Sequence, residues 1–537
     1  MATSQYDAII IGGGHNGLVC GTYLARAGLR VKVLERRHVF GGAAVTEEFT
    51  PGFRASTFSY VMSILHPRII ADLELRRFGL EVLPASDLFC PLWHDDSLIF
   101  SDDGRKTQAS FARFSRKDAE AYPAFDAYLQ ESLQVVRRLL FQTPIDPTRT
   151  DWRHLKETAR LAWEYRKIGS QFYRIVDLLT QSADDYLSQW FESDVVKAVF
   201  SYYASIGTFA GPKTPGSAYV LLHHLMGEHQ GAGGWGFIKG GMGTITQSIA
   251  QSGARFGLTV ETDSPVAEVL VRDGRATGVV TAAGEEYRAP LVISNLDART
   301  LMTRLVDPAA LPEDYLRDLR GFRTFSTAFK INVACHRPPQ YSAFDPAAAG
   351  FDYPTYVHIA PDIEYLERAY DDAKYGAWSK HPFVTPVVPT IRDDTLAPPG
   401  KHVVNLFGGH APYELKGAVW DQAERDRFVG AVLDTVETFA PGWRSEIIDM
   451  QVLLAPDLER MVGLPQGHIF HGELAPDQVF FTRPAAHYAD YRTPIAGLWV
   501  CGSSMHPGGG VSGIPGFNAA REVLKDRGKG RNPRPSS

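Results

Sequence analysis

Three glycines near the start of the chain have the spacing of a dinucleotide-binding turn. Gly12, Gly14 and Gly17 follow a short apolar run and open a helical pattern, and Glu35 closes the next apolar run. The first glycine permits a tight turn, the second lets the backbone approach a pyrophosphate, and the third lets the helix pack closely on the strand. The helix N-terminus offers unpaired N–H groups to phosphate, and the acid can accept hydrogen bonds from ribose hydroxyls. The expected cofactor contacts here are Gly12, Gly14, His15, Asn16, Gly17 and Glu35.

A second strand, glycine and helix pattern lies near the other end of the chain and favours FAD over NAD. The apolar run 498–501 is followed by Gly502, a glycine-rich loop, and a helical pattern from Phe517. Amides of such a loop can face the pyrimidine edge of a flavin, and the helix dipole stabilises negative charge on the reduced ring. A flexible loop directly after Glu35 also suits a ligand longer than NAD. The expected contacts are Arg36, Gly41, Gly42, Ala43, Gly502, Gly508, Gly509, Gly510, Val511 and Gly513.

Hydride transfer to flavin N5 does not require a conspicuous acid or base. It requires mainly that a C–H bond be held near the ring in a dry pocket. His506, beside the second glycine loop, is the predicted catalytic residue, and a purely structural histidine is the competing interpretation. Four further candidates with the same structural alternative precede it: His471, Asp477, Arg483 and Tyr488.

The motifs of a metal site and of a second nucleotide site are incomplete. The group His223, His224, Glu228 and His229 lacks the order H-E-x-x-H, so no metal is predicted. The turn at 240–243 resembles a phosphate loop but misses its third glycine. Because no site for NAD(P)H is evident, we expect oxygen, a quinone or another acceptor to reoxidise the flavin.

The elements that must position these residues begin with a βαβ unit. Apolar and alternating runs predict strands, and a 3.6-residue period predicts helices. The segment 111–187 reads as mostly helical, with a break at Pro144 and Pro147 because proline lacks a backbone donor. Asp273 and Gly274 predict a hairpin turn. The expected strands are 6–11, 30–34, 266–271, 276–281, 291–294, 325–334, 403–407 and 498–501, and the expected helices outside 111–187 include 244–256 and 517–525.

Because the two glycine motifs lie at opposite ends of the chain, the FAD-binding domain must be discontinuous. The expected fold class is α/β, a Rossmann-type FAD-binding domain with an inserted α+β substrate domain that includes a helical subdomain. The predicted FAD-binding segments are 1–75, 235–300 and 490–527, the predicted substrate-domain segments are 76–234 and 301–489, and 528–537 is a predicted disordered tail.

The composition excludes several classes of protein. The 537 residues are 44% hydrophobic and 22% charged, which is typical of a globular chain. A net charge of −6 without a dominant basic block argues against nucleic acid as a partner. Four widely spaced cysteines form no CxxC pair and favour a reducing, cytoplasmic compartment. No signal peptide is visible, and no apolar run approaches the roughly 18 to 20 residues that span a bilayer.

The segment 152–176 interleaves aromatic and apolar residues with basic ones. It holds six Lys or Arg and two Glu, which gives a local charge of +4. Peripheral contact with an anionic membrane surface is one interpretation of a basic amphipathic helix with tryptophans. The other interpretation is a helix packed on its own domain with a solvated charged face.

Six runs of the sequence together resemble the phytoene desaturase and carotenoid isomerase-related flavoproteins, and the closest branch is the one named for the pyridine nucleotide-disulfide oxidoreductase domain. The runs are YDAIIIGGGHNGLVCGTYLARAG, VLERRHVFGGAAVTEEFTPGF, FIKGGMGTITQSIA, VISNLDA, FFTRPAAHYADYRTPIAGLWVCG and HPGGGVSGIPGFNAA. The resemblance implies FAD as cofactor and main-chain contact of Val266 with the adenine, where a plain core valine is the alternative. The sequence lacks the redox CxxC that the branch name suggests.

The sequence therefore predicts an FAD-dependent oxidoreductase of the desaturase, dehydrogenase or oxidase type. Its expected substrate is a hydrophobic, polyene-like small molecule that loses hydride to flavin N5. Two alternatives stay open: a redox-neutral flavin-dependent isomerase, and a non-catalytic FAD-stabilised scaffold. Oligomeric state is not predicted.

Overall fold

A parallel sheet assembled from distant parts of the chain forms one half of the molecule. The computed structural model describes residues 6–166, 169, 171–227 and 235–528. Residues 8–11, 292–294 and 498–500 of this sheet are all buried, as expected for parallel strands covered on both faces. The five strands are, in spatial order, β18 (Leu498–Val500), β13 (Leu291–Ser294), β1 (Ala8–Ile11), β2 (Val31–Leu34) and β9 (Thr259–Glu261). The predicted α/β fold class with a parallel nucleotide-binding sheet is thereby confirmed.

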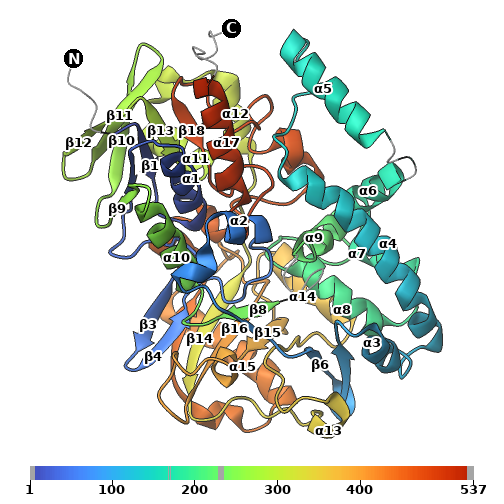
Figure 1. The fold of residues 1–537 in the computed structure, drawn as a ribbon. Coiled ribbons are helices and arrows are strands. Elements are labelled where there is room, and N and C mark those ends of the chain that lie inside the picture. The colour runs from blue at the N-terminus through green and yellow to red at the C-terminus, as the bar shows by residue number, and fades with distance from the viewer. Residues whose placement is uncertain (1–5, 167–168, 170, 228–234, 529–537) are drawn as a thin grey trace.

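Three helices pack together beside this sheet (Figure 1). They are α1 (His15–Arg26), α10 (Gly243–Ala254) and α17 (Ile514–Gly528), and α1 contacts both of the others. The last helix begins three residues before the predicted start because Pro515 is tolerated in a first turn, where its missing donor has no partner to lose. Gly528 is the final residue of α17, so the predicted disordered tail is wrong at this position. The rest of that tail lies outside the described residues.

An antiparallel hairpin sheet lies between β9 and β13 in the chain. It consists of β10 (Val266–Arg272), β11 (Arg275–Thr281) and β12 (Glu286–Arg288). Asp273 and Gly274 both adopt positive φ, 50° and 71°, which is the geometry of the predicted tight turn.

A second, antiparallel sheet forms the lower half of the molecule in Figure 1. Its order is β15 (Val384–Val387), β16 (His402–Gly408), β14 (Phe329–Cys335) and β17 (Ile447–Leu453). All seven residues of β14 are buried, because the strand lies between two neighbours and under α15 (Gln422–Phe439). Phe428, Val432 and Val436 of α15 belong to the same hydrophobic core as this sheet. The boundaries predicted for the two domains are not tested by this arrangement and stay predictions.

A helical region flanks both sheets, with the predicted break after residue 140. Its helices are α4 (Arg116–Leu140), α5 (Trp152–Tyr165), α6 (Gln171–Thr180), α7 (Ala183–Ser188), α8 (Asp194–Ser205) and α9 (Ser217–His224). Within the described residues, no helix combines the length and the hydropathy that crossing a membrane would require. Shorter elements include β3 (Thr46–Thr50), β4 (Phe53–Ser56), α2 (Pro67–Asp72), β6 (Leu88–Leu92), β7 (Asp96–Phe100), α3 (Gly104–Phe111), α12 (Glu313–Gly321), α14 (Ile363–Lys374) and α16 (Ala455–Val462).

Candidate functional site

The first glycine turn lies at the carboxyl end of β1 and leaves no room for side chains. Gly14 is the N-cap of α1, and a Cβ there would lie 2.5 Å from Asn295 Nδ2. A Cβ on Gly17 would lie 2.4 Å from the carbonyl oxygen of Gly12. Both distances are shorter than real contacts, so only glycine keeps the first turn of α1 against β1 with its amides open to a ligand.

Glu35 is tied to this turn through both of its carboxylate oxygens. Oε2 accepts a hydrogen bond from the backbone N–H of Gly13 at 2.8 Å, and Oε1 accepts one from Arg37 at 2.9 Å. The side chain is buried, yet a carboxylate has about four lone-pair positions, so acceptor capacity remains for ribose hydroxyls. Glu35 therefore both shapes the turn and can hold the sugar.

The two glycine segments predicted from opposite ends of the chain meet at this point. His15 Nε2 donates a hydrogen bond to the carbonyl oxygen of Gly510 at 3.1 Å. Asn16 Nδ2 donates to Ser503 Oγ, also at 3.1 Å. Burial lowers the pKa of His15 to about 4, so the imidazole is neutral at pH 7. The convergence follows from the sheet, where β13 pairs with β1 on one side and β18 on the other.

A cavity of about 290 Å³ runs along the first turn. Asn16 Oδ1 and His471 Nδ1 are buried there without a hydrogen-bond partner among the described residues, which leaves them available to a bound molecule. Of the predicted cofactor residues, those lining it are Gly12, Gly14, His15, Asn16, Glu35, Arg36, Gly42, Ala43 and Val266. Helix-terminal amides, a cation, an acid and an apolar strand residue fit the phosphates, ribose and adenine of FAD.

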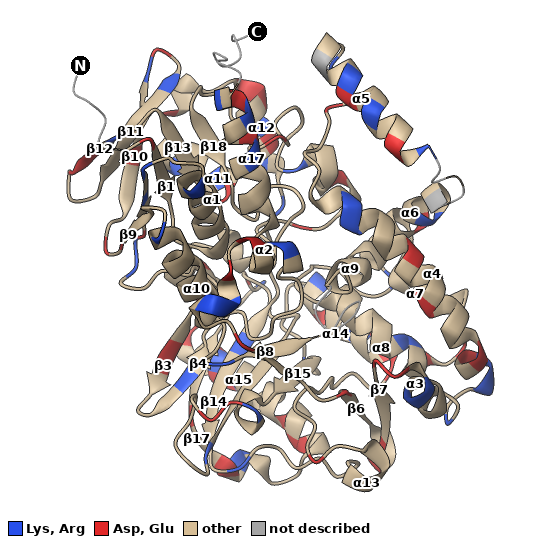
Figure 2. Ribbon diagram, in the orientation of Figure 1, with Lys and Arg blue, Asp and Glu red and all other residues tan. Residues whose placement is uncertain are grey.

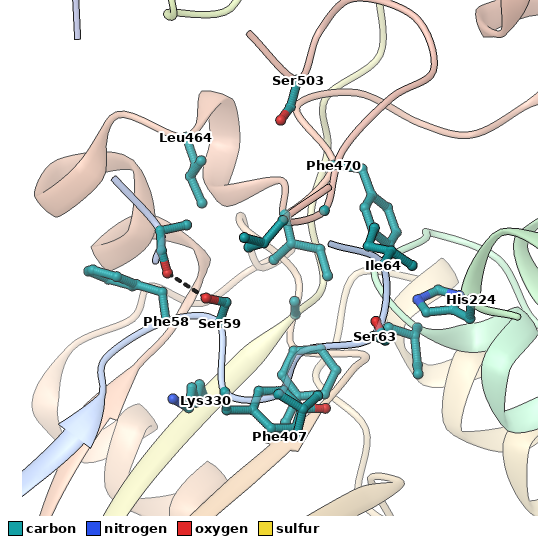
Figure 3. Close-up of a pocket in the computed structure, with 18 of the residues that line it drawn as sticks. Phe58, Ser59, Ser63, Ile64, His224, Lys330, Phe407, Leu464, Phe470 and Ser503 are labelled. Atoms are coloured by element: carbon teal, nitrogen blue, oxygen red, sulfur yellow. Dashed lines mark hydrogen bonds between the residues drawn. The ribbon is translucent and has the colours of Figure 1, made fainter. Parts of the chain in front are cut away.

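A second cavity of about 150 Å³ adjoins the first, and its walls are mainly apolar. Figure 3 shows Phe407 on one side of it, Leu464 and Phe470 on another, and Ile64 and His224 at the right. Gly510 and Val511 of the second glycine loop also line it. The residues common to both cavities are His15, Ala43, Leu464, His471 and Ser503. A ligand with its phosphates at the first turn can therefore extend into the apolar cavity.

Lys330 is a basic residue in the lining of this apolar cavity. It is on the buried strand β14, and Nζ donates a hydrogen bond to the carbonyl oxygen of Ser56. Burial holds the pKa of Lys330 well below its ordinary value, because the charged form loses its hydration. The sequence analysis missed this residue, although Lys330 is one of only two polar side chains, with Asn332, in the run Phe329–Cys335.

Arg483 links the wall of the apolar cavity to the second glycine segment. Its side chain is fully buried, and its two Nη atoms donate to five backbone carbonyl oxygens at 2.8 to 3.4 Å. Burial lowers the pKa of Arg483 to about 10, which still leaves the guanidinium charged at pH 7. The acceptors belong to Phe470, Gly472, Glu473, Gln478 and Ser503. The arginine thereby joins the cavity wall at Phe470 to the loop that carries Ser503.

The remaining predicted residues lie at or behind the cavity walls. His506 lines neither cavity; its Nε2 donates to the carbonyl oxygen of Leu139 at 3.0 Å, and burial lowers its pKa to about 4. Its catalytic role stays a prediction. Gly41 supports the first turn through a hydrogen bond from its N–H to the carbonyl oxygen of Gly13 at 2.8 Å.

The other glycines of the C-terminal segment pack against neighbouring backbone and side chains. A Cβ on Gly502 would lie 2.5 Å from the Asn295 carbonyl oxygen, and one on Gly509 2.2 Å from Phe470 Cα. Gly508 and Gly513 have positive φ, 117° and 73°. These four line neither cavity, and their contact with the cofactor stays a prediction.

The other candidates from the sequence are separated by the fold. Asp477 pairs with Arg323 at 2.7 Å, and the ring of Tyr488 lies against Tyr315. His223 and His224 line the apolar cavity, whereas Glu228 and His229 lie outside the described residues. Within the described ranges, no group of three His, Cys, Asp or Glu side chains is arranged to hold a metal ion.

Comparisons with known proteins agree with this geometry. Residues 17–524 match the family model described as flavin containing amine oxidoreductase. The chain is 40% identical to the pyridine nucleotide-disulfide oxidoreductase domain-containing protein 2 of Rattus norvegicus, over 97% of this chain and 94% of that protein. It is 24% identical to the lycopene-forming phytoene desaturase of Pseudescherichia vulneris, over 94% of this chain and 96% of that one.

A solved structure of putrescine oxidase bound to putrescine has the same fold, with a TM-score of 0.61 at 16% identity over 98% of this chain and 99% of that chain. The matches confirm the resemblance drawn from the sequence motifs, and they confirm FAD as the cofactor.

Proposed function

The chain belongs to the flavin containing amine oxidoreductase family and is an FAD-dependent oxidoreductase, and from this premise we propose that it oxidises a hydrophobic small molecule held in the apolar cavity. The observation that carries the proposal is the wall that the two cavities share. Five residues line both, and the apolar one is bounded by His15, Gly510 and Val511, where the two glycine segments meet.

The chemistry of the cavity wall favours an apolar substrate over a cationic one. Among its described lining residues there is no Asp or Glu, while Phe58, Ile64, Phe407 and Phe470 supply apolar surface. A charged amine brought into such a site would lose its hydration without gaining a counter-ion. An apolar substrate is stabilised there by about 25 cal/mol for each Å² of surface removed from water.

The residues that would hold FAD are those of the first cavity, with the second glycine segment at the flavin end. Amides at the start of α1 and Arg36 would hold the phosphates, and Glu35 would hold the ribose. When bound, FAD supplies a ring position that accepts hydride from carbon. The surrounding apolar side chains would exclude water. They would also hold the C–H bond of the substrate near that position.

Lys330 is the group best placed to receive a proton. Desaturation removes a hydride from one carbon and a proton from its neighbour, so the site needs a base as well as a hydride acceptor. Burial holds the pKa of Lys330 well below its usual value, which favours the neutral amine that can accept a proton. The two electrons then pass from the reduced cofactor to oxygen, a quinone or another acceptor.

Anaerobic reduction of the FAD-loaded protein tests the proposal. Limonene and phytoene, which appear in the names of relatives, serve as apolar probes, and putrescine serves as a cationic control. We expect an apolar probe to bleach the oxidised flavin spectrum while putrescine leaves it unchanged. Reduction by putrescine alone, or by none of a broad panel of lipophilic compounds, would refute the proposed substrate class.

Two variants distinguish the proposed base from a wall residue. Lys330→Met keeps the length and apolar body of the side chain but removes the lone pair, so we expect slower flavin bleaching with FAD still bound. Phe407→Leu, on the neighbouring strand of the same cavity, should change substrate affinity more than the maximal rate of reduction. Turnover that consumes no acceptor and needs pre-reduced flavin would instead identify an isomerase.

A further inference from the structure

Helix α5 presents an apolar stripe to solvent. Trp152, Leu155, Ala159 and Trp163 recur at intervals of three and four residues and therefore share one helix face. Trp152 is 82% exposed and Trp163 68% exposed, and the other two are exposed as well. A monomeric protein seldom leaves two tryptophans on one stripe in water, so this face calls for a partner.

Basic residues border the stripe, whereas Glu157 and Glu164 interact with Lys525 and Gln142. Lys156, Arg160 and Arg166 are exposed, and the Arg166 guanidinium lies 3.8 Å from the centroid of the Trp163 ring. Glu157 turns toward the body of the protein and pairs with Lys525 of α17 at 3.1 Å. Figure 2 shows basic positions along α5, with acidic positions between them. The outward face is therefore cationic on a chain whose net charge is −6.

The position of α5 suits contact with an extended surface. The helix lies at the edge of the molecule, apart from both sheets (Figure 1). Next along the chain, α6 carries Phe172 and Tyr173, which are also strongly exposed, and α6 packs on α9. His223 and His224 of α9 line the apolar cavity. The exposed aromatic residues are thus two helices away from the site where a lipophilic substrate would bind.

We propose that α5, continued by α6, docks the protein on the surface of a lipid bilayer that contains anionic lipids. Trp152, Leu155 and Trp163 enter the boundary between headgroups and acyl chains, and Lys156, Arg160 and Arg166 extend toward the phosphates of the headgroups. An anionic bilayer surface offers an apolar environment to the stripe and negative charges to the basic residues beside it. The inference goes beyond the proposed oxidation, since it concerns where the enzyme works and does not depend on substrate identity.

Vesicle sedimentation with the FAD-loaded full chain tests this docking. One set of vesicles is phosphatidylcholine alone, and the other contains one third phosphatidylglycerol. We expect the protein to sediment with the anionic vesicles at low salt, to stay in solution with the neutral ones, and to be released as salt screens the charges. Failure to sediment with anionic vesicles, or equal and salt-independent binding to both sets, would overturn the proposal.

Two double variants separate the apolar and the electrostatic contributions. Trp152→Ser/Trp163→Ser should weaken partitioning at least tenfold. Lys156→Glu/Arg160→Glu should weaken it about 30-fold or more, because each cation near an anionic surface contributes about 1 kcal/mol. All four side chains are exposed, so flavin content and thermal unfolding should match the wild type.

The matched control replaces two other strongly exposed apolar side chains that do not belong to α5 or α6. Tyr375 is 73% exposed and Val419 71% exposed, and Tyr375→Ser/Val419→Ser should sediment like the wild type. If this control loses as much binding as the tryptophan variant, the attraction is not specific to α5 and the proposal fails. It also fails if the chain is a dimer in solution that the tryptophan variant dissociates, because a second copy would then cover the stripe.

Discussion

Replacing Arg483 by methionine removes the guanidinium that ties the cavity wall to the second glycine segment. Methionine has similar length and no donors, so the five carbonyl oxygens at 2.8 to 3.4 Å lose their shared partner. The side chain is fully buried, and water cannot simply take its place. The carbonyl groups of Phe470 and Ser503 then lose the side chain that links them, so the two segments are no longer fixed relative to each other.

The expected cost follows from two opposing contributions. A hydrogen bond from a charged donor contributes about 1.5 to 3 kcal/mol, and five that share one group are not additive. Against this stands the desolvation of the guanidinium, which is large enough to bring its pKa to about 10. Breaking a buried charged network costs about 3 to 5 kcal/mol, and we expect the free energy of unfolding to fall by about this amount.

Urea unfolding and FAD titration of the refolded apoprotein measure the two consequences. Arg483→Met should lower both the unfolding midpoint and the affinity for FAD, and Arg483→Lys should recover only part of each, since an ammonium lacks the planar fork of donors. Arg492 is the matched control: it pairs with Glu522 and Asp526 at 3.0 and 2.8 Å and lines neither site cavity. Arg492→Met should lower stability while FAD affinity is kept. Wild-type FAD affinity in Arg483→Met would refute the reasoning.

Three further predictions concern the cofactor turn, the base and the buried imidazoles. Gly17→Ala should weaken FAD binding by at least a hundredfold in a fluorescence titration, because its Cβ would lie 2.4 Å from a carbonyl oxygen, whereas Gly430→Ala, in open space on α15, should bind normally. In stopped-flow reduction by an identified substrate, Lys330→Met should be slowed at pH 7 to 8; an unchanged rate would remove Lys330 as the base. Burial lowers the pKa of His223 and of His471 to about 3. Below about pH 6.5, the unfolded chain therefore binds protons at these residues that the folded chain does not bind. The free energy of unfolding should therefore fall between pH 6.5 and about 3, by at most about 1.4 kcal/mol per pH unit for each histidine. Urea midpoints measured across this range should show a shallower slope in His223→Phe, and an equal slope would contradict the assignment.

Much of the nucleotide-binding half could be predicted because its signals are local. Gly12, Gly14 and Gly17 lie within six residues of one another, and the apolar runs of the parallel strands are continuous in the sequence. Glu35 could be placed because a short strand fixes its distance from the turn. The strand, glycine and helix pattern at both ends of the chain predicts that the first turn and the Gly510 loop lie close together. The sheet order places them there, because β13 pairs with both β1 and β18.

The rest of the site depends on contacts that the sequence does not display. Asn295 meets Gly14 across 281 positions, and Ser503 meets Asn16 across 487. Lys330 reaches the cavity only because two strands bury β14 on both sides. His506 was selected for its proximity in sequence to the glycine loop, but its ring turns toward Leu139 of α4 instead of the cavities.

The interleaved parallel sheet has a consequence for how the holoenzyme is made. Strand β1 is translated first, its neighbour β13 follows almost three hundred residues later, and β18 completes the edge only near residue 500. Such long-range pairing slows folding, because the chain loses conformational entropy before the stabilising contacts form. A ribosome-bound fragment that ends before β18 lacks Ser503 and Gly510, so flavin incorporation must await release of the C-terminal segment. Until then the half-built sheet exposes a strand edge that chaperones would need to shield.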